Sequence, residues 1–291
     1  MTTRCALVTG SSGQDGTYLV AELISQKYSV VATTRPPFAE NIRQPTRHGD
    51  VQTIALDVTD SDAIAAALRT FEPDLVFNLA GMSSGQGMFQ DPVAIAHVNG
   101  VAVATILEAI RQKRPSARFC QASSSEVFGL PLSSPQTEDS PARPRSPYGA
   151  AKLYADHMIQ IYRQRFGLFA CSAILFNHES PLRRSEFVTR KVTSAAAAIK
   201  LCLQTTVALG DLDARRDWGF AGDYMRAMRL MLEQQQPLDY VLATGETHSV
   251  RDLCRVAFAR VGLDYRPYVQ SDAGAAPSTC RRVVPSSRSA G

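Results

Sequence analysis

The sequence predicts an α/β protein with a doubly wound parallel sheet of the Rossmann type and a smaller C-terminal substrate lobe. Through the first 176 residues, short β-branched runs alternate with longer helical stretches, as in a parallel sheet that is covered on both faces. A glycine-rich turn joins the first such run to the first helical stretch. The length of 291 residues is sufficient for one core with an appended lobe that encloses a substrate.

The predicted strands are short apolar runs rich in β-branched residues, at residues 5–9, 29–34, 52–56, 74–78, 117–121 and 168–175. The helices expected between them cover residues 17–26, 61–71, 93–114 and 147–166. Right-handed crossovers between parallel strands place the ligand crevice at the carboxyl ends of the strands. Functional residues are therefore expected directly after each strand.

After Phe176 the alternation becomes irregular, with a helix at about residues 186–203, a short strand near Val207 and a helix around residues 222–234. We expect a cofactor-binding domain over residues 1–176 with a returning segment near 214–242, and an interleaved substrate lobe over residues 177–270. Residues 271–291 are rich in Ser, Ala, Arg and Pro and lack periodicity, so a flexible tail is expected there.

The composition is typical of a globular enzyme, with 45% hydrophobic and 20% charged residues. The 31 basic and 27 acidic residues leave a net charge of only +4 without long charged runs, which disfavours nucleic-acid binding but allows a local site for a phosphorylated ligand. Six separate cysteines without a C-x-x-C pair indicate reduced thiols in a cytoplasmic protein. We expect no signal peptide, no membrane helix of roughly 20 apolar residues, and no metal site among the scattered histidines.

The glycine-rich turn has the sequence GSSGQDG and the strand-turn-helix context of a dinucleotide-binding loop. Its spacing allows the backbone to approach a pyrophosphate, and the helix N-terminus directs free N–H groups and the positive end of its dipole at the charge. A tight turn without a ligand is the alternative interpretation. The candidate cofactor contacts in this turn are Gly10, Gly13, Gln14, Asp15 and Gly16.

Cofactor choice is decided at the end of the second strand, where NAD enzymes have an acidic residue for the ribose hydroxyls. This chain has two threonines and Arg35 there, so the guanidinium can bind a 2′-phosphate and NADP is the expected cofactor. Asp57 and Val58 after the third strand are candidate adenine contacts, and Leu79 and Ala80 after the fourth strand are expected beside the cofactor. Ordinary loop residues are the alternative for these two pairs.

Tyr148 and Lys152 lie four residues apart, on one face of a predicted helix. An isolated tyrosine has a pKa of about 10, so it needs a nearby cation to act as a base at neutral pH, and Lys152 supplies that cation. A surface pair is the alternative for this common spacing. Ser124, just after the fifth strand, brings a hydroxyl to the same crevice and completes the Ser, Tyr and Lys set of the short-chain dehydrogenases.

Glu126, two positions after Ser124, is the informative additional residue. A dehydrogenase that only moves a hydride does not need a second acid and base, whereas an enzyme that removes a carbon-bound proton and expels water does. The pattern therefore favours a dehydratase. A buried structural carboxylate is the alternative interpretation.

Five longer motifs, in their order and spacing, resemble the GDP-mannose 4,6-dehydratase family over nearly all of residues 4–268. They are QASSSE at 121–126, PRSPY at 144–148, LFNHESP at 175–181, EFVTRKV at 186–192 and DARRDWGFAGDY at 213–224. The resemblance implies a redox-neutral reaction on GDP-mannose or a related nucleotide sugar, in which hydride moves from C4 to NADP and later returns to C6. Tyr148 would remove the C4 hydroxyl proton, Ser124 would polarise the C4 oxygen, and Glu126 would eliminate water across C5 and C6.

The resemblance also implies that Lys191 and Arg216 bind the substrate diphosphate, for which solvated surface charge is the alternative. Tyr148 and Lys152 would contact the cofactor as well. The expected substrate contacts are Ser83, Ser124, Glu126, Asn177, Lys191 and Arg216.

The sequence departs from the family pattern in three places. Arg35 is followed by Pro36 and Pro37, where the family has a second arginine and a serine run that reach a neighbouring subunit's cofactor. We therefore expect a homodimer, with the family's homotetramer as the alternative. The family's Arg-Pro-x-Glu segment, which contacts the nucleotide ribose, is missing after Tyr268, and GMSSG at 81–85 replaces the usual Ala-Gln-Ser, so the nucleotide and the sugar are open.

Two other functions remain alternatives. A nucleotide-sugar 4-reductase or epimerase would share the fold, but ketone reduction has no use for Glu126. A non-catalytic nucleotide-sugar-binding protein would have no use for Ser124, Tyr148 and Lys152. The catalytic set therefore favours the dehydratase.

Overall fold

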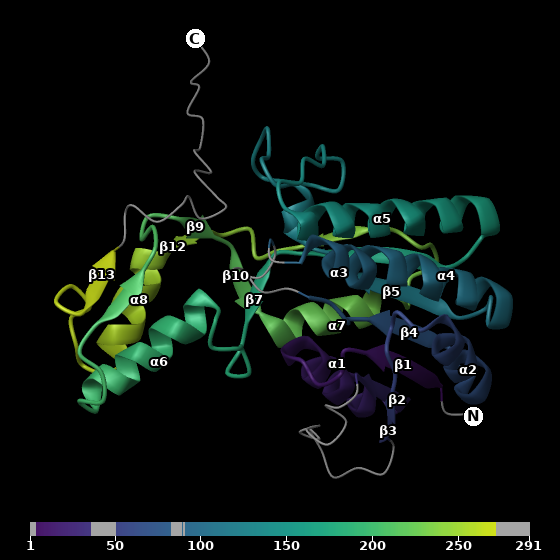
Figure 1. The fold of residues 1–291 in the computed structure, drawn as a ribbon, viewed down its shortest axis with the longest axis horizontal. Helices are drawn as coiled ribbons and strands as arrows, with labels where there is room; N and C mark the ends of the chain where they lie inside the picture. The colour runs from purple at the N-terminus through teal and green to yellow at the C-terminus, as the bar shows by residue number, and fades with distance from the viewer. Residues whose placement is uncertain (1–3, 36–50, 83–88, 90, 272–291) are drawn as a thin grey trace.

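The computed structural model describes residues 4–35, 51–82, 89 and 91–271. The elements of its large part are β1 (Cys5–Thr9), α1 (Gln14–Ser25), β2 (Ser29–Thr34), β3 (Val51–Ala55), α2 (Ser61–Phe71), β4 (Leu75–Asn78), α3 (Pro92–Ala96), the π-helical turn η3 (His97–Val101), α4 (Ala102–Lys113), β5 (Arg118–Ala122), the 3₁₀ turn η4 (Ser125–Val127), α5 (Pro147–Phe166), β6 (Ala170–Leu175), α7 (Ala221–Met231) and β11 (Tyr240–Leu242). The elements of the smaller lobe and its connections are β7 (Asn177–Glu179), α6 (Val188–Lys200), β8 (Val207–Leu209), β9 (Arg215–Arg216), β10 (Trp218–Phe220), β12 (His248–Ser249), α8 (Val250–Arg260) and β13 (Val269–Ser271). Figure 1 shows the large part on the right and the lobe, with α6 and α8, on the left.

Seven parallel strands form the central sheet in the order β11-β6-β5-β4-β1-β2-β3. The winding direction changes at β1, because β2 and β3 extend to one side of it and β4, β5 and β6 to the other. A doubly wound sheet binds its ligand at this switch point, outside the carboxyl ends of the strands. The predicted fold class is confirmed.

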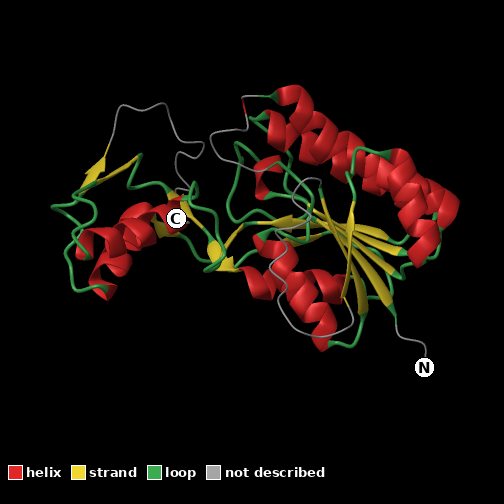
Figure 2. Ribbon diagram, turned by 60° about the horizontal axis from the view of Figure 1, so that its bottom comes forward, coloured by secondary structure: helices red, strands yellow, loops and turns green. Residues whose placement is uncertain are grey.

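Helices cover both faces of the sheet, and Figure 2 shows the yellow strands between two layers of red helices. One face carries α2, α4 and α5, whose core includes Leu107 and Ile159. The other face carries α1 and α7, whose core includes Leu23 and Met225. Burial of each such side chain stabilises the folded protein by about 1.5–3 kcal/mol. The two cores therefore hold the helices firmly on the sheet, whose carboxyl edge carries the site.

The smaller lobe has its own apolar core, in which α6 packs against α8 through side chains such as Val192, Cys254 and Phe258. Ser249 and Asp252 form a capping box at the start of α8, which is a local signal that predicts a helix at this position. The parallel pair β7 and β10 and the antiparallel pair β9 and β12 connect the lobe to the sheet domain. The predicted domain limits remain a prediction.

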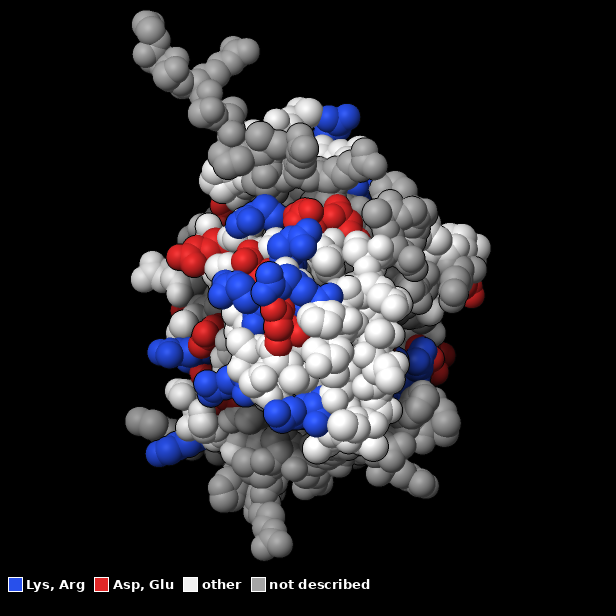
Figure 3. Space-filling model, turned by 90° about the vertical axis from the view of Figure 1, so that its left-hand side faces the viewer, with Lys and Arg blue, Asp and Glu red and all other residues white. Residues whose placement is uncertain are grey.

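The outer face of the lobe carries mixed charge, and Figure 3 shows basic and acidic side chains next to one another. Arg251 pairs with Asp213 at 2.9 Å, and Arg255 lies 3.7 Å from Asp252. These arginines are exposed and neutralised locally. They do not form the continuous basic stripe by which a nucleic acid is usually bound.

The segment Pro92–Lys113 contradicts the expectation that no segment is apolar enough to cross a membrane. It has the length and composition of a membrane helix, with a mean hydropathy of 1.8, but half of it is buried inside the protein. The π-helical turn η3 interrupts its regular helix between α3 and α4. Because buried core helices pass the same composition test, we interpret this segment as a helix that covers the sheet.

The strand and helix predictions were closest where apolar cores dictate the pattern. β1, β2, α2 and α5 have the predicted limits, whereas α1 begins at Gln14 instead of residue 17. The helix predicted at 186–203 is shorter, because Phe187 has extended backbone and Cys202 adopts a left-handed φ of 58°. Ser271 belongs to β13, and the remaining tail residues, 272–291, lie outside the described part of the chain.

Candidate active site

The glycine-rich turn between β1 and α1 brings the backbone against its neighbours in a way that side chains would prevent. Gly10 has a left-handed φ of 69°, and a Cβ there would lie 2.7 Å from the amide nitrogen of Ala80. A Cβ on Gly16 would lie 2.4 Å from the Cα of Ser11. Gly13 caps α1, whose first residue is Gln14. The turn therefore presents the free N–H groups of a helix N-terminus to the pocket, which suits a diphosphate.

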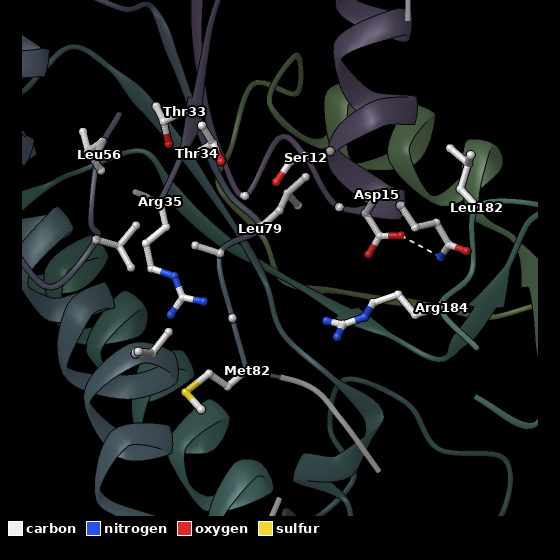
Figure 4. Close-up of a pocket in the computed structure, with 18 of the residues that line it drawn as sticks. Ser12, Asp15, Thr33, Thr34, Arg35, Leu56, Leu79, Met82, Leu182 and Arg184 are labelled. Carbon is white, nitrogen blue, oxygen red and sulfur yellow. Dashed lines mark hydrogen bonds between the residues drawn. The ribbon is translucent and has the colours of Figure 1, made fainter. Parts of the chain in front are cut away.

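A pocket of about 550 Å³ lies over this turn. It is lined by every cofactor contact that was predicted in the turn and at the carboxyl ends of β2, β3 and β4. The side of the pocket beyond β2 is formed by Thr34, Arg35, Asp57 and Val58. Two hydrogen bonds from Thr59 hold Asp57 and lower the pKa of its carboxyl group. Arg35 points into the pocket (Figure 4), as the sequence predicted for a 2′-phosphate ligand.

Sequence reasoning missed two arginines, Arg183 and Arg184, and several apolar residues that complete the pocket wall. The apolar residues are Leu56, Met82, Val98, Leu182 and Phe187. Figure 4 shows the guanidinium groups of Arg184 and Arg35 entering the pocket from opposite sides. Arg183 is held by Glu179 at 3.1 Å and lies 3.6 Å over the ring of Phe187. The signal for the two arginines is a pair of adjacent arginines one residue after the LFNHESP motif.

Asn99 fixes the pocket floor beyond β4, and sequence reasoning also missed it. Its side-chain oxygen accepts a hydrogen bond from the amide of Met82 at 3.1 Å, and its amide group donates to the carbonyl oxygens of Met82 and Ile95. Asn99 lies in the π-helical turn η3, and such turns are frequent at functional sites. No single-residue signal in the sequence distinguishes this asparagine from others.

The predicted catalytic residues meet at the carboxyl edge of the sheet. Ser124 caps the 3₁₀ turn η4 after β5, and Ser146 caps α5 so that Tyr148 and Lys152 lie in its first two turns. The ammonium group of Lys152 donates a hydrogen bond to the carbonyl oxygen of Ala122 at 2.7 Å and lies 5.7 Å from the centre of the Tyr148 ring. The structure therefore brings Ser124, Tyr148 and Lys152 together at this edge, and their catalytic roles remain a prediction.

Burial is the largest influence on the pKa values of Tyr148 and Lys152 when no ligand is bound. It raises the pKa of Tyr148 to about 12, although a hydrogen bond with Ser124 opposes the rise. It also lowers the pKa of Lys152 to about 8. The sequence analysis expected Lys152 to lower the pKa of Tyr148, but burial is the largest effect and raises that pKa, and Ser124 and Arg183 are the groups that oppose the rise. Ionisation of Tyr148 therefore needs additional positive charge in the pocket.

Glu126 lies in the turn η4 beside these residues, and its Oε2 is buried without a hydrogen-bond partner. Burial raises the pKa of Glu126, while Arg145 and Arg216 lower it. An unpartnered carboxylate oxygen is costly, so such groups are commonly retained for function. A purely structural carboxylate would have both oxygens satisfied.

Asp156 is a buried carboxyl group one helical turn beyond Lys152. Its two oxygens accept hydrogen bonds from the hydroxyl groups of Ser123 at 2.6 Å and Ser172 at 2.7 Å. Burial raises the pKa of Asp156 to about 6, and its negative charge raises the pKa of Lys152. The four-residue spacing from Lys152 was visible in the sequence, but burial was not.

Three of the predicted substrate contacts come from β7, α6 and β9. Asn177 begins β7, Lys191 is exposed in the first turns of α6, and Arg216 lies in β9 close enough to Glu126 to lower its pKa. The structure therefore brings Arg216 near Glu126, while Lys191 is exposed on α6. Ser83 lies outside the described residues.

The carboxyl edge of the sheet carries a dinucleotide-type loop, a phenol, an ammonium group and a separate carboxyl group. The last three do not line the pocket over the glycine turn, but a Cβ on Gly81, which does line it, would lie 3.8 Å from Nζ of Lys152. The phenol and Ser124 can remove a proton from a hydroxyl group as hydride leaves the same carbon. Glu126 can move a second proton at a neighbouring carbon. Among the described residues, no group of histidine, cysteine or carboxylate side chains could hold a metal ion.

Comparison with known proteins finds similarity to one family along almost the whole chain. The family model described as GDP-mannose 4,6 dehydratase matches residues 7–288. The chain is 41% identical to GDP-mannose 4,6 dehydratase 2 of Arabidopsis thaliana over 92% of this chain and 75% of that protein. It is 43% identical to GDP-mannose 4,6-dehydratase of Sinorhizobium fredii over 89% of this chain and 77% of that protein.

Solved structures agree in fold. A dTDP-glucose 4,6-dehydratase of Streptomyces venezuelae, determined with NAD, superimposes with a TM-score of 0.82 at 23% identity, over 92% of this chain and 84% of that one. The protein RMD of Pseudomonas aeruginosa, complexed with NADPH, gives a TM-score of 0.78 at 24% identity, over 93% of this chain and 85% of that one. At these identities the structures support the fold alone.

Proposed function

Because the chain belongs to the GDP-mannose 4,6-dehydratase family, we propose that it is a hydro-lyase that converts GDP-mannose to GDP-4-keto-6-deoxymannose with loss of water. The observation that carries the proposal is the unpartnered, buried oxygen of Glu126 next to Ser124, Tyr148 and Lys152. A simple reductase or epimerase of this fold has no task for that carboxyl group.

The proposed cofactor is a nicotinamide dinucleotide, and specifically NADP. When bound, the cofactor supplies an acceptor for the hydride from C4 and a donor of hydride to C6. The glycine turn fits its diphosphate, because side chains at Gly10 and Gly16 would collide with the backbone there. Arg35 supports NADP over NAD, since a guanidinium binds a 2′-phosphate by charge-assisted hydrogen bonds and the described end of β2 carries no carboxylate.

In the first half-reaction Tyr148 takes the proton of the C4 hydroxyl group. Ser124, which hydrogen-bonds to Tyr148, polarises the same oxygen. Lys152 holds its ammonium group beside the ring, which favours the ionised phenol. A bound oxidised cofactor would add positive charge, which would favour the ionised phenol as well.

In the second half-reaction Glu126 removes the C5 proton, which the C4 ketone has made acidic, and delivers a proton to the leaving C6 hydroxyl group. The products of this step are water and a 5,6-unsaturated ketone. C6 then takes the hydride, and C5 takes one proton that balances the proton Tyr148 removed from the C4 hydroxyl group. Both residues return to their starting states, so the net change is loss of one water. A raised pKa suits Glu126, because the group must both take and return a proton near neutral pH.

The test is a mass-spectrometric assay of the purified protein with a panel of nucleotide sugars, GDP-mannose included, and catalytic NADP without a reductant. We expect GDP-mannose to lose one water. Glu126→Gln should abolish that loss yet still allow reduced nicotinamide to accumulate by its absorbance, since C4 oxidation needs Tyr148 but not Glu126. Glu246→Gln, which changes an exposed carboxylate of the lobe, is the matched control.

The outcomes of this assay separate the alternatives. Dehydration of a different panel member would retain the chemistry and change the substrate. Binding of both ligands without any product would indicate a non-catalytic nucleotide-sugar-binding protein and would contradict the proposal. Exchange of configuration at C4 without loss of water would indicate an epimerase.

The proposal includes a homodimer. The helices that cover one face of the sheet expose large apolar side chains, namely Val93 and Val101 on the Pro92–Lys113 segment and Tyr154 and Ile161 on α5. A second copy of the chain that packs there would bury them, which explains an apolar helix that is only half covered. Light scattering should show a dimer, and Ile161→Glu should yield monomers. A tetramer that survives this substitution would contradict the proposed interface.

A further inference from the structure

His178 occupies the centre of β7, between the sheet domain and the lobe, and both of its ring nitrogens have acceptors. Nδ1 lies 2.7 Å from the carbonyl oxygen of Phe176, and Nε2 lies 3.0 Å from a carboxylate oxygen of Asp15. A carbonyl oxygen only accepts, so Nδ1 must carry a hydrogen. An ionised Asp15 also only accepts, so Nε2 must carry one as well. A ring with two N–H groups is an imidazolium cation.

Asp15 is ionised in this arrangement. It lies in the first turn of α1, where the helix dipole favours a negative charge, and its second oxygen accepts a hydrogen bond from the side-chain amide of Gln14 at 3.0 Å. Burial alone would raise the pKa of Asp15, but His178, Gln14 and Arg183 together outweigh burial, with His178 contributing most, and the pKa is lowered. Burial would likewise lower the pKa of His178, but the charge of Asp15 raises it.

The groups that face His178 come from four elements. Asp15 projects from α1, and Glu179 is the next residue of β7. Arg183 follows from the loop, and the ring of Tyr224 on α7 stacks on the imidazole with centres 4.8 Å apart. Burial also raises the pKa of Tyr224, so that phenol stays neutral. Asp15 is the one whose carboxylate makes an ion pair with the ring.

The position of Asp15 makes this pair relevant to the cofactor. Asp15 lines the pocket directly beside the glycine turn, where the diphosphate of a dinucleotide is expected. An uncompensated carboxylate there would repel the diphosphate and cancel part of the attraction of the helix N-terminus. The cation of His178 removes that repulsion while leaving the backbone N–H groups free.

Hydrogen bonds of Gln14 also join the glycine turn to β7 and the residue that follows it. The side-chain amide of Gln14 donates to the backbone carbonyl oxygen of His178 at 3.2 Å, and its oxygen accepts from the hydroxyl group of Ser180 at 2.8 Å. Asn177, the proposed substrate contact, is the residue before His178. Thus the start of α1 and the start of the lobe are tied by one polar cluster.

We propose that His178 is a positioning residue that acts as the counter-ion to Asp15 at neutral pH, so that the glycine turn binds an anionic dinucleotide while it remains fastened to the substrate strand. The inference rests on the dinucleotide of the proposed function, but not on the sugar or on the dehydration. It assigns His178 neither proton transfer nor contact with the substrate.

The test is a calorimetric titration of the unliganded protein with NADP and with NAD between pH 6 and 9. His178→Gln should weaken binding by about tenfold, because it leaves a carboxylate uncompensated beside a diphosphate. The double variant His178→Gln/Asp15→Asn should bind more tightly than His178→Gln, within about threefold of the single Asp15→Asn variant. His248→Gln, at an exposed histidine of β12, is the control.

The pH dependence of dinucleotide affinity distinguishes the proposed role of His178 from a purely structural one. Wild-type affinity should fall as pH rises through the raised pKa of His178, and His178→Gln should lack that component. Lys152 titrates in both proteins, so the difference between the two profiles isolates His178.

A second measurement does not depend on any variant that must fold. In ¹⁵N-imidazole spectra of the wild-type protein at pH 7.5, one histidine should be doubly protonated. Neutral rings at all histidines would overturn the inference. So would a His178→Gln protein that binds NADP like wild type, or a double variant no better than His178→Gln. A wild-type protein that binds neither dinucleotide would instead overturn the proposed cofactor, and the inference with it.

Discussion

The buried catalytic cluster and the open basic rim of the pocket differ in what controls their charges. Tyr148, Lys152 and Asp156 are buried, and burial moves the pKa of each away from its ordinary value. Arg35 at the rim lines the pocket, is exposed and acts as a positive charge. Substitutions in the cluster should therefore change the rate and its pH dependence, whereas substitutions at the rim should change ligand affinity.

The largest effect is expected at the centre of the cluster. Tyr148→Phe removes the proton acceptor for the C4 hydroxyl group but preserves the ring, so kcat should fall about a thousandfold, as is usual for loss of a general base. Dehydration of GDP-mannose by mass spectrometry measures the loss. Tyr154→Phe, on the exposed face of the same helix, should retain normal kcat. More than a tenth of wild-type kcat in Tyr148→Phe would remove the tyrosine from the mechanism.

Arg35 offers the clearest effect at the rim. Arg35→Ser should weaken NADP binding by about ten- to a hundredfold, which corresponds to loss of charge-assisted hydrogen bonds to one phosphate. NAD lacks that phosphate, so its affinity should hardly change and serves as the internal control. Calorimetric titration of both dinucleotides checks this. Equal losses for NADP and NAD would mean that Arg35 does not select the 2′-phosphate.

Arg216 belongs to both regions and should show both kinds of effect. Arg216→Gln should raise KM for GDP-mannose about tenfold, because it removes a charge from the proposed diphosphate site. Arg216 also lowers the pKa of Glu126, so its removal should raise that pKa and move the acidic limb of the kcat profile to higher pH. Lys191→Gln should raise KM without moving the limb. Identical profiles for the two variants would contradict the assigned positions.

The smallest effect is expected behind the cluster, at Asp156. The carboxylate raises the pKa of Lys152, so Asp156→Asn should lower that pKa below about 8 and move the basic limb of the pH-rate profile to lower pH. Activity at pH 8 should fall severalfold, and activity at pH 6.5 should change less. Ser172→Ala removes one hydrogen bond to Asp156 but retains its charge, so its basic limb should stay in place. An unmoved basic limb in Asp156→Asn would show that the carboxylate does not act on Lys152.

The sequence was sufficient for the features that depend on local pattern. The alternation of apolar runs predicted the sheet, the glycine spacing predicted the turn, and the four-residue spacing predicted that Tyr148 and Lys152 share a face. Each of these follows from backbone geometry within a few residues. The long motifs then identified the family.

What the sequence could not supply depends on contacts between distant segments. His178 meets Asp15 across 163 residues, and Ser172 meets Asp156 only because β6 lies under α5. The short strands β7, β9, β10 and β12 form through such pairing and have no apolar alternation to predict them. The pKa of Tyr148 was misjudged for the same reason, since burial is a property of the folded chain.

The most direct test of the account follows one hydrogen atom. GDP-mannose with deuterium at C4 is incubated with the protein and catalytic NADP, and the product is examined by NMR and mass spectrometry. The account predicts that the deuterium appears at C6 of a 4-keto-6-deoxy sugar, because the hydride removed from C4 is returned within the same turnover. A product that carries only solvent hydrogen at C6, or a product that retains its C6 hydroxyl group, would contradict internal hydride transfer and the dehydratase assignment.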